Sequence, residues 1–299
     1  MKIAEAEKQI KEQLKMIYEE QEAINISELV IEDITSLSKA KRLIKKDEVL
    51  SPGQSDKLHQ YIQRLQKNEP VQYVLQKTVF CGLEIFVNND VLIPRPETEE
   101  LVDWIVNDVA SEGKDVFERR PGEADETTEL KILDVGTGSG CIALALKKIL
   151  PKAEVWACDI SEGALNVARR NGSQLDIRID FLGLDFLNPA EQKQLPTVDI
   201  VVCNPPYVPM SDKEKMNANV VDHEPHAALF VPDDDALVFY KILAEFGEKR
   251  IYPNGRIYME IHEDLGKEVM EIFQKHGYRN VTLKKDMQGK DRMVRAGRT

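Results

Sequence analysis

Val198-Asp-Ile-Val-Val-Cys-Asn-Pro-Pro-Tyr207 is the stretch that decides the fold of this chain. The run Thr197 to Cys203 predicts a buried strand, because β-branched residues with one polar interruption suit a sheet covered on both faces. The prolines that follow cannot donate to a β-ladder, so the backbone must leave the sheet at Asn204. In open α/β sheets, ligands bind at the carboxyl ends of the strands. The stretch therefore predicts an α/β fold with a stiff loop at a ligand site.

The chemistry of this loop favours binding of a planar NH2 group. Asn204 carries an acceptor oxygen, and Pro205 contributes a carbonyl without a competing N–H. Together they can accept both hydrogens of the NH2 group, while Tyr207 packs on its flat face. An amide or aryl-amine nitrogen is a poor nucleophile, and this arrangement would direct its lone pair at an electrophile. The alternative is a strand-ending turn without function, which is typical of Asn-Pro alone.

A glycine-rich loop upstream predicts a cofactor site. The strand Leu130 to Val135 runs into Gly136-Thr-Gly-Ser-Gly140 and then into an apolar helix, Cys141 to Ile149. Asp159 follows the next strand, 19 residues after Gly140, and can accept hydrogen bonds from two ribose hydroxyls. The loop residues expected to contact the cofactor are Gly136, Thr137, Gly138, Ser139 and Gly140.

The end of the third strand, Ile177 to Leu184, favours an adenine-binding position. Asp185 and Phe186 could hold an adenine ring by its amino group and its face, although Phe186 is equally compatible with a plain core residue. The spacing G-x-G-x-G also differs from the G-x-G-x-x-G that grips a pyrophosphate. A cofactor with a ribose and an adenine but no pyrophosphate fits better. We therefore expect S-adenosylmethionine, with Asn204 beside both the cofactor and the substrate.

The chain divides into three predicted segments. Residues 1–75 predict a helical bundle that docks a partner, with a turn at Asn25 to Leu29 and Ser27 as a helix cap. Residues 76–92 predict a β-hairpin linker. Residues 93–299 predict a seven-stranded, mostly parallel sheet, with a helix starting at Pro232 and a turn at Tyr252 to Gly255. The polar stretch Ser111 to Glu129 is expected to be a mobile surface loop.

Composition narrows the class of protein. The 299 residues are 42% hydrophobic and 31% charged, with a net charge of -12. Residues 1–75 hold 12 Lys and Arg against 13 Asp and Glu, so nearly all of the acidic excess lies in residues 76–299. Such a domain is poorly suited to gripping a phosphate backbone, so we expect no direct nucleic-acid binding. We expect a cytoplasmic protein without a membrane segment, because no apolar run has spanning length, no signal peptide is apparent, and the four cysteines form no C-x-x-C pair. We also expect a monomer.

No metal site is expected. His223 and His226 lie in a loop running from Met210 to Ala228, and no third ligand of suitable spacing accompanies them. We interpret this segment as a lid-like or positioning loop. Arg95, between two prolines, is aimed by a rigid backbone and is a candidate substrate contact; a surface arginine is the alternative.

Together these strings resemble the release factor glutamine methyltransferases, the PrmC/HemK group. The matching strings are Pro70-Val-Gln-Tyr73, Val91-Leu-Ile-Pro-Arg-Pro-Glu-Thr-Glu99, Asp134-Val-Gly-Thr-Gly-Ser-Gly-Cys-Ile-Ala143, Asn204-Pro-Pro-Tyr207, Glu224-Pro-His-Ala-Ala-Leu229 and Gly289-Lys-Asp-Arg292. The resemblance implies a Rossmann-like class I methyltransferase. It would move a methyl group from S-adenosylmethionine, leaving S-adenosylhomocysteine, to N5 of the glutamine in the Gly-Gly-Gln motif of peptide chain release factors.

The resemblance also implies residue roles. Gly136 to Gly140 and Asp159 would bind the cofactor, with Phe186 beside adenine. Asn204, Pro205, Pro206 and Tyr207 would hold the glutamine amide. Two departures stand out. The family commonly has Glu-Ile-Gly where this chain has Glu260-Ile-His262, and Gly-x-Asp-Gly-Leu where it has Pro232-Asp-Asp-Asp-Ala-Leu237.

Three alternatives remain open from the sequence. A ribosomal-protein glutamine is a related substrate. A nucleic-acid adenine N6-methyltransferase would use the same acceptors, because Asn-Pro-Pro-Tyr also occurs in DNA adenine methyltransferases. A non-catalytic module would bind the cofactor without turnover.

Overall fold

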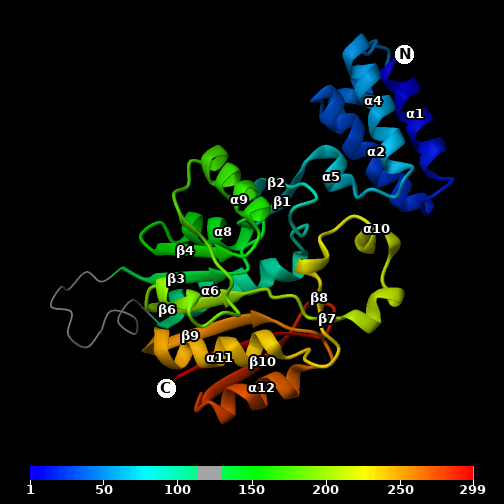
Figure 1. Cartoon of the computed structure of the whole chain (residues 1–299). Helices are drawn as coiled ribbons and strands as arrows, with labels where there is room; N and C mark the ends of the chain where they lie inside the picture. Colours follow the sequence, from blue (N-terminus) through cyan, green and yellow to red (C-terminus); the bar gives the residue numbers. More distant parts are fainter. Residues whose placement is uncertain (113–128, 299) are drawn as a thin grey trace. The chain divides into compact units, whose positions relative to one another are not determined.

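The computed structural model describes residues 1–112 and 129–298. The predicted mobile loop at Ser111 to Glu129 lies almost entirely outside these residues. The chain forms two compact units (Figure 1). The smaller unit comprises Met1–Lys77 together with Asn217–His223, and the larger comprises Thr78–Met216 together with Glu224–Thr299.

The smaller unit is a bundle of short amphipathic helices. Its helices are α1 (Ile3–Leu14), α2 (Glu20–Thr35), α3 (Lys39–Ile44), α4 (Pro52–Leu65), α5 (Val71–Leu75) and α10 (Ala218–Val221). The apolar faces of α1, α2 and α4 meet in one core, in which Ile10, Leu14 and Leu58 are fully buried. Ser51 is the N-cap of α4, and its hydroxyl accepts a hydrogen bond from the Gln54 amide at 3.2 Å.

The predicted turn at Asn25 to Leu29 is wrong. These residues lie inside α2, and Ser27 is buried with its hydroxyl donating to the Ala23 carbonyl at 2.6 Å. Asn and Ser lower helix propensity by only a fraction of a kcal/mol. Five apolar residues of α2 are buried in the core, whereas Leu29 is exposed, so tertiary packing decides the conformation.

A short β-hairpin opens the larger unit. Strands β1 (Lys77–Phe80) and β2 (Leu83–Phe86) pair with each other, as the sequence predicts. Cys81 and Gly82 form the turn with φ angles of 47° and 74°. Left-handed conformations at both positions are typical of two-residue hairpin loops.

A seven-stranded sheet organises the larger unit, counted over the residues that the structure describes. The strand order is β10-β11-β9-β6-β3-β4-β5. The strands are β3 (Lys131–Val135), β4 (Glu154–Asp159), β5 (Asp180–Gly183), β6 (Val198–Cys203), β9 (Ile251–Glu260), β10 (Asn280–Lys285) and β11 (Asp291–Gly297). Strands β9, β6, β3, β4 and β5 are parallel, and β11 runs antiparallel to both β9 and β10. Every residue of β6 is buried, as expected for a central strand.

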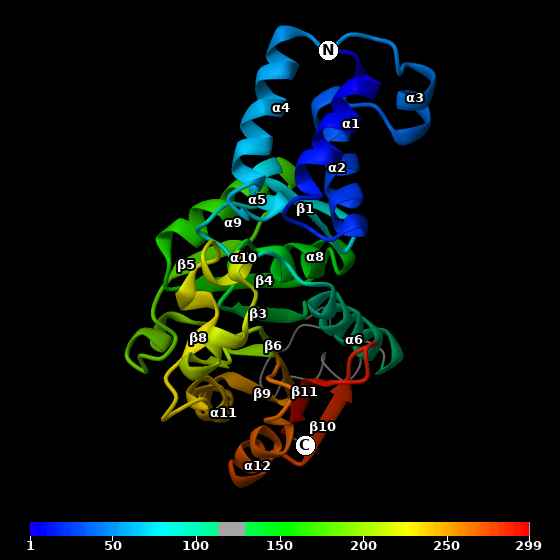
Figure 2. The ribbon, with the colours of Figure 1, turned by 90° about the vertical axis from the view of Figure 1, so that its right-hand side faces the viewer.

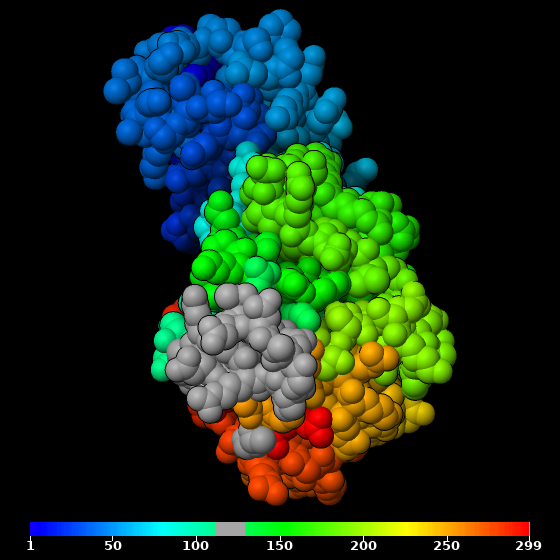
Figure 3. Space-filling model, turned by 90° about the vertical axis from the view of Figure 1, so that its left-hand side faces the viewer, coloured from blue at the N-terminus to red at the C-terminus, as the bar shows by residue number. Residues whose placement is uncertain are grey.

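Helices cover both faces of this sheet. They are α6 (Pro96–Glu112), α8 (Cys141–Ile149), α9 (Glu162–Leu175), α11 (Val238–Arg250) and α12 (Gly266–Lys275). Figure 2 shows α6 and α11 on opposite sides of the strands. In the space-filling view, the green segments and the orange-to-red C-terminal segments of this unit both reach the same face (Figure 3). No helix within the described ranges has the length and apolar character needed to span a bilayer.

Two predictions in the last third of the chain are wrong. The expected turn at Tyr252 to Gly255 belongs to β9, whose pairing with β6 shifts register between Val198 and Ile200. A Cβ at Gly255 would lie 2.6 Å from the carbonyl of Asp199, so the close approach of the strands requires glycine. The helix expected from Pro232 begins only at Val238, after a turn in which the Asp235 amide donates to the Pro232 carbonyl.

The long segment after β6 contains short elements instead of a single loop. They are β7 (Val208–Pro209), a 3-10 turn η2 (Met210–Lys215), α10, a 3-10 turn η3 (His226–Ala228) and β8 (Phe230–Val231). Strand β7 pairs in parallel with β8, which ties the two ends of the segment together within the larger unit. A further 3-10 turn, η1 (Glu191–Gln194), precedes β6.

Candidate active site

A cavity of about 630 Å³ lies at the carboxyl ends of β3, β4 and β6, within the larger unit. Most residues that the sequence singles out line it. The predicted site residues in its wall are Arg95, Gly136, Thr137, Gly138, Ser139, Asp159, Asp185, Phe186, Asn204, Pro205 and Pro206. Gly140 and Tyr207 lie outside this lining. The position agrees with the rule that ligands bind at the carboxyl edge of an open parallel sheet.

The glycine loop between β3 and α8 leaves room for a ligand. Gly136 and Gly138 have φ angles of 71° and 54°, which side chains rarely adopt. A Cβ at either position would meet no atom within 4 Å, so the wall of the cavity is bare backbone there. Gly140 has a different role, because its Cβ would lie 3.1 Å from the Cβ of Ala168. This glycine permits close packing of α8 on α9.

A buried carboxyl group supports the loop from below. Asp134, near the end of β3, is fully buried, and its Oδ2 accepts a hydrogen bond from the Thr137 hydroxyl at 2.6 Å. Burial raises the pKa of Asp134 to about 7, and the bond from Thr137 opposes this rise. Asp134 therefore anchors the loop and does not line the cavity.

Asp159, the last residue of β4, binds the backbone around the loop. Its Oδ2 accepts from the Gly138 amide at 2.8 Å, and its Oδ1 accepts from the Ser161 amide at 2.9 Å. Burial raises its pKa, and these amide bonds act against the rise. Each carboxylate oxygen has further lone-pair capacity, so the group can still accept hydrogen bonds from a ligand in the cavity.

The residues expected to hold adenine after β5 contact both the cavity and the hydrophobic core. Asp185 Oδ1 accepts from the Leu187 amide at 2.9 Å, which closes a tight turn at the cavity wall. Phe186 is 5% exposed, and its ring packs edge-on against Phe246 in the core with centroids 5.2 Å apart. Because Phe186 also lines the cavity, both roles that the sequence left open remain compatible with its position.

A chain of hydrogen bonds holds the Asn204 side chain at the cavity wall. Asn204 Nδ2 donates to Thr98 Oγ1 at 3.2 Å, and the Thr98 hydroxyl donates to Glu260 Oε2 at 2.7 Å. The Tyr207 hydroxyl donates to the other carboxylate oxygen of Glu260 at 2.8 Å. Tyr207 is thus tied to Glu260 by its hydroxyl, and its expected packing on a substrate amide stays a prediction.

Arg95 lies beside a buried acid that the sequence did not single out as functional. Its Nη2 is 2.6 Å from Glu224 Oε1, and Oε2 of the same carboxylate accepts from the Ile93 amide at 3.2 Å. The Glu224 side chain is 1% exposed and the Arg95 side chain 33% exposed. Arg95 lines the cavity, and Glu224 holds one terminal nitrogen of its guanidinium, which has further donors for a ligand.

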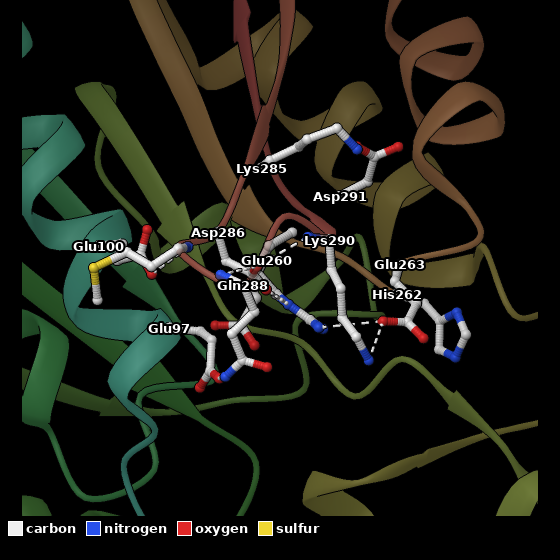
Figure 4. Close-up of polar contacts among 12 residues, drawn as sticks. Glu97, Glu100, Glu260, His262, Glu263, Lys285, Asp286, Gln288, Lys290 and Asp291 are labelled. Carbon is white, nitrogen blue, oxygen red and sulfur yellow. Dashed lines mark hydrogen bonds and ion pairs between the residues drawn. The ribbon is translucent and has the colours of Figure 1, made fainter.

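The turn between β10 and β11 forms a polar cluster near the start of α6 (Figure 4). Lys290 Nζ lies 2.7 Å from Glu263, and Arg292 Nε donates to Asp286 at 3.1 Å. Gln288 donates to Glu97 at 3.1 Å, which joins the turn to α6, the helix that carries Thr98. His262, where the family commonly has glycine, has its ring centroid 6.3 Å from that of Tyr207.

The two histidines considered for a metal site make other contacts. His223 Nε2 lies 3.0 Å from the Lys67 carbonyl within the smaller unit, and the His226 ring packs edge-on against Phe230. In the part of the chain that is described, no group of three or more His, Cys, Asp or Glu side chains could hold a metal ion.

Three residues of the site were missed as functional candidates by reasoning on the sequence: Thr98, Glu224 and Glu260. Thr98 and Glu224 lie in strings that carry the family resemblance, and Glu260 begins the Glu-Ile-His string that departs from the family, so these strings were the available signal. Nothing local indicates their roles, because each acts through a partner more than 100 positions away.

Comparison with known proteins agrees with the fold. Residues 5–75 match the PrmC N-terminal domain, and residues 123–227 match the Methyltransferase small domain. The catalytic domain of hMettl16 shares the fold, with a TM-score of 0.54 and 16% identity over 83% of each chain. The predicted Rossmann-like methyltransferase fold is therefore confirmed.

Relatives of similar length identify the family. A release factor glutamine methyltransferase of Bacteroides thetaiotaomicron is 42% identical over 289 residues, which are 97% of this chain and 98% of the relative. One of Flavobacterium psychrophilum is 38% identical over 282 residues, 94% of each chain. Both similarities extend over the smaller and the larger unit. The chain therefore belongs to the release factor glutamine methyltransferase family.

Proposed function

We propose that this protein transfers the methyl group of S-adenosylmethionine to the side-chain amide nitrogen of the glutamine in the Gly-Gly-Gln motif of peptide chain release factors. The observation that carries this proposal is the Asn204 carboxamide, held at the wall of the cavity that the glycine loop also lines. Pro205 is buried beside it and offers a carbonyl without an N–H. The pair suits a planar NH2 group whose two hydrogens need acceptors.

The residues around the cavity fit S-adenosylmethionine. The bare backbone at Gly136 and Gly138 allows close approach of a ligand, and Asp159 offers acceptors suited to ribose hydroxyls. Asp185 and Phe186 line the cavity where we expect the adenine. When bound, this cofactor supplies an electrophilic sulfonium methyl group.

The role of the protein in the transfer is to position an amide nitrogen. Hydrogen bonds to Asn204 and Pro205 restrict rotation of the substrate amide and stabilise the positive charge that develops on its nitrogen. Arg95 and Pro206 also line the cavity and are proposed substrate contacts, while Tyr207 closes the loop. The reaction leaves S-adenosylhomocysteine, and the methylated amide then loses a proton.

We base proposals on the roles of the segments and the kind of substrate on the charge and the domain organisation of the chain. We propose that residues 1–75 dock the release factor, that residues 76–92 form a linker and that residues 93–299 carry out the transfer. The net charge of -12 supports a protein substrate, without direct binding of nucleic acid. We further propose that the enzyme works as a monomer in the cytoplasm.

A transfer assay tests the proposal. The protein is incubated with S-adenosylmethionine labelled in its methyl group and with a purified release factor, and the digested substrate is analysed by mass spectrometry. We expect label on the glutamine of the Gly-Gly-Gln motif and none on a Gln→Ala substrate. Label on adenine in added DNA or on a ribosomal protein, with none on the release factor, would contradict the proposal.

A further inference from the structure

In the chain of hydrogen bonds from Asn204 through Thr98 to Glu260, the chemistry of the groups fixes which atom donates in each bond. Glu260, the last residue of β9, is 1% exposed, and Thr98, in the first turn of α6, is 2% exposed. An ionised carboxylate can only accept hydrogen bonds. The single hydrogen of the Thr98 hydroxyl is therefore committed to Glu260, at 2.7 Å.

The use of the Thr98 hydrogen in this bond decides which end of the Asn204 side chain faces the cavity. Since the Thr98 oxygen has no second hydrogen to give, it can only accept from Asn204, and the NH2 end of the carboxamide must face it, at 3.2 Å. The carbonyl end, Oδ1, is then left for the ligand. A carboxamide turned the other way would place its oxygen against the Thr98 oxygen and present a donor to the substrate NH2 group.

The same carboxylate holds the other end of the loop. Glu260 Oε1 accepts from the Tyr207 hydroxyl at 2.8 Å, and its main-chain carbonyl accepts from the Tyr240 hydroxyl at 3.2 Å. Burial raises the pKa of Glu260, while the donors Thr98 and Tyr207 and the charge of Arg292 counter the rise. Both donors thus stabilise the ionised form on which the direction of the chain depends.

We propose that Glu260 and Thr98 are positioning residues that fix the orientation of the Asn204 carboxamide, so that its oxygen, and not its NH2 group, meets the substrate amide. This inference rests on the proposed function for its catalytic consequence. Its structural part concerns only the side chain of Asn204 and can be tested without turnover.

Substitution of Thr98 separates orientation from binding. Thr98→Val keeps the shape but removes the hydroxyl, and Thr98→Ser keeps the hydroxyl. We expect Thr98→Val to lower the single-turnover rate of transfer by about tenfold to a hundredfold, because small errors in placement of a reacting group have effects of this size. The dissociation constant of S-adenosylmethionine should stay within about twofold of the wild-type value, and Thr98→Ser should recover most of the rate. Thr282→Val, which removes a hydroxyl that accepts from Arg295 Nη2 at 3.3 Å in β10, away from the cavity lining, is the matched control and should leave the rate unchanged.

Three results would overturn the inference. They are a Thr98→Val rate equal to wild type, a Thr98→Ser rate as low as that of Thr98→Val, or a loss of rate matched by an equal loss of cofactor affinity. If Thr98→Val does not fold, Glu260→Gln takes its place. A Gln side chain has a single acceptor oxygen, whereas the Thr98 and Tyr207 hydroxyls each donate to a separate oxygen of Glu260. A reduced rate is therefore again expected, and an unchanged rate contradicts the proposal.

A measurement on the wild-type protein distinguishes failure of this inference from failure of the proposed function. The side-chain NH2 resonances of Asn204, assigned by their loss in Asn204→Asp, should show hydrogen-bonded shifts and slow exchange in the wild type. Both properties should be lost in Thr98→Val and kept in Thr98→Ser. If the wild type labels no release factor but shows this pattern, the proposed function fails and the orientation stands. If the resonances do not respond to Thr98→Val, the orientation fails whatever the activity.

Discussion

Replacing Gly138 with alanine should weaken binding of S-adenosylmethionine, whereas the same change at Gly277 should not. Both glycines have a positive φ, 54° and 81°, and a Cβ at either would meet no protein atom within 4 Å. Each substitution should therefore lower the free energy of unfolding by a similar amount, about 1–2 kcal/mol, from the left-handed backbone alone. Only Gly138 lines the cavity, so only there does the added methyl group occupy space for a ligand.

Isothermal titration with S-adenosylmethionine measures the difference between the two variants, and chemical unfolding measures their stability. We expect the dissociation constant of Gly138→Ala to rise by at least about tenfold, equivalent to ~1.4 kcal/mol. Gly277→Ala should bind as the wild type does. Equal affinities for the two variants would show that the backbone at Gly138 does not approach the cofactor, and the cavity would have to be reassigned.

Three further predictions concern charged groups. Asp159→Ala should weaken cofactor binding by about 1–3 kcal/mol in a titration with S-adenosylmethionine, because it removes acceptors at the cavity. A binding affinity close to that of the wild type would show that Asp159 only supports the loop. Arg42→Ala should lower the free energy of unfolding of the smaller unit by ~2–3 kcal/mol, since the side chain is 3% exposed and bonded to Glu7 at 2.9 Å. In the same denaturant experiment, the free energy of unfolding of the exposed control Lys8→Ala should change by less than ~0.5 kcal/mol. Because the pKa of Asp134 is raised from 3.8 to about 7, its contribution to stability is full below pH 4 and falls as pH rises to 7, by at most ~1.4 kcal/mol per pH unit. Unfolding of Asp134→Asn should show a flatter pH dependence over that range, and identical slopes would contradict the raised pKa.

The sequence predicts the central part of the fold well, because local chemistry and topology agree there. Strand β3, the glycine loop, α8 and β4 with Asp159 follow one another in a βαβ arrangement, and β6 pairs beside β3, so that these strand ends meet at one edge of the sheet. The site built on those ends could therefore be located before any contact was known. Where packing competes with local preference the predictions fail, as at Ser27, which the core of the smaller unit holds within α2.

Contacts between distant positions account for what the sequence could not predict at the site. Thr98 and Glu260 are 162 positions apart, and Arg95 and Glu224 are 129 apart. Their pairing depends on the register of β9 in the sheet and on the path of the segment between β6 and α11. Asn204 could be identified from its own surroundings, but the groups that orient it could not.

Single-turnover transfer by Asn204→Ala tests the central claim most directly. The variant is saturated with S-adenosylmethionine and mixed with a release factor, and the rate is compared with that of the wild type at equal cofactor occupancy. The account predicts a rate at least about a hundredfold lower, as for loss of a group that stabilises charge in a transition state, with cofactor affinity largely kept. Transfer at the wild-type rate would contradict the account, because the carboxamide would then have no part in holding the amide nitrogen.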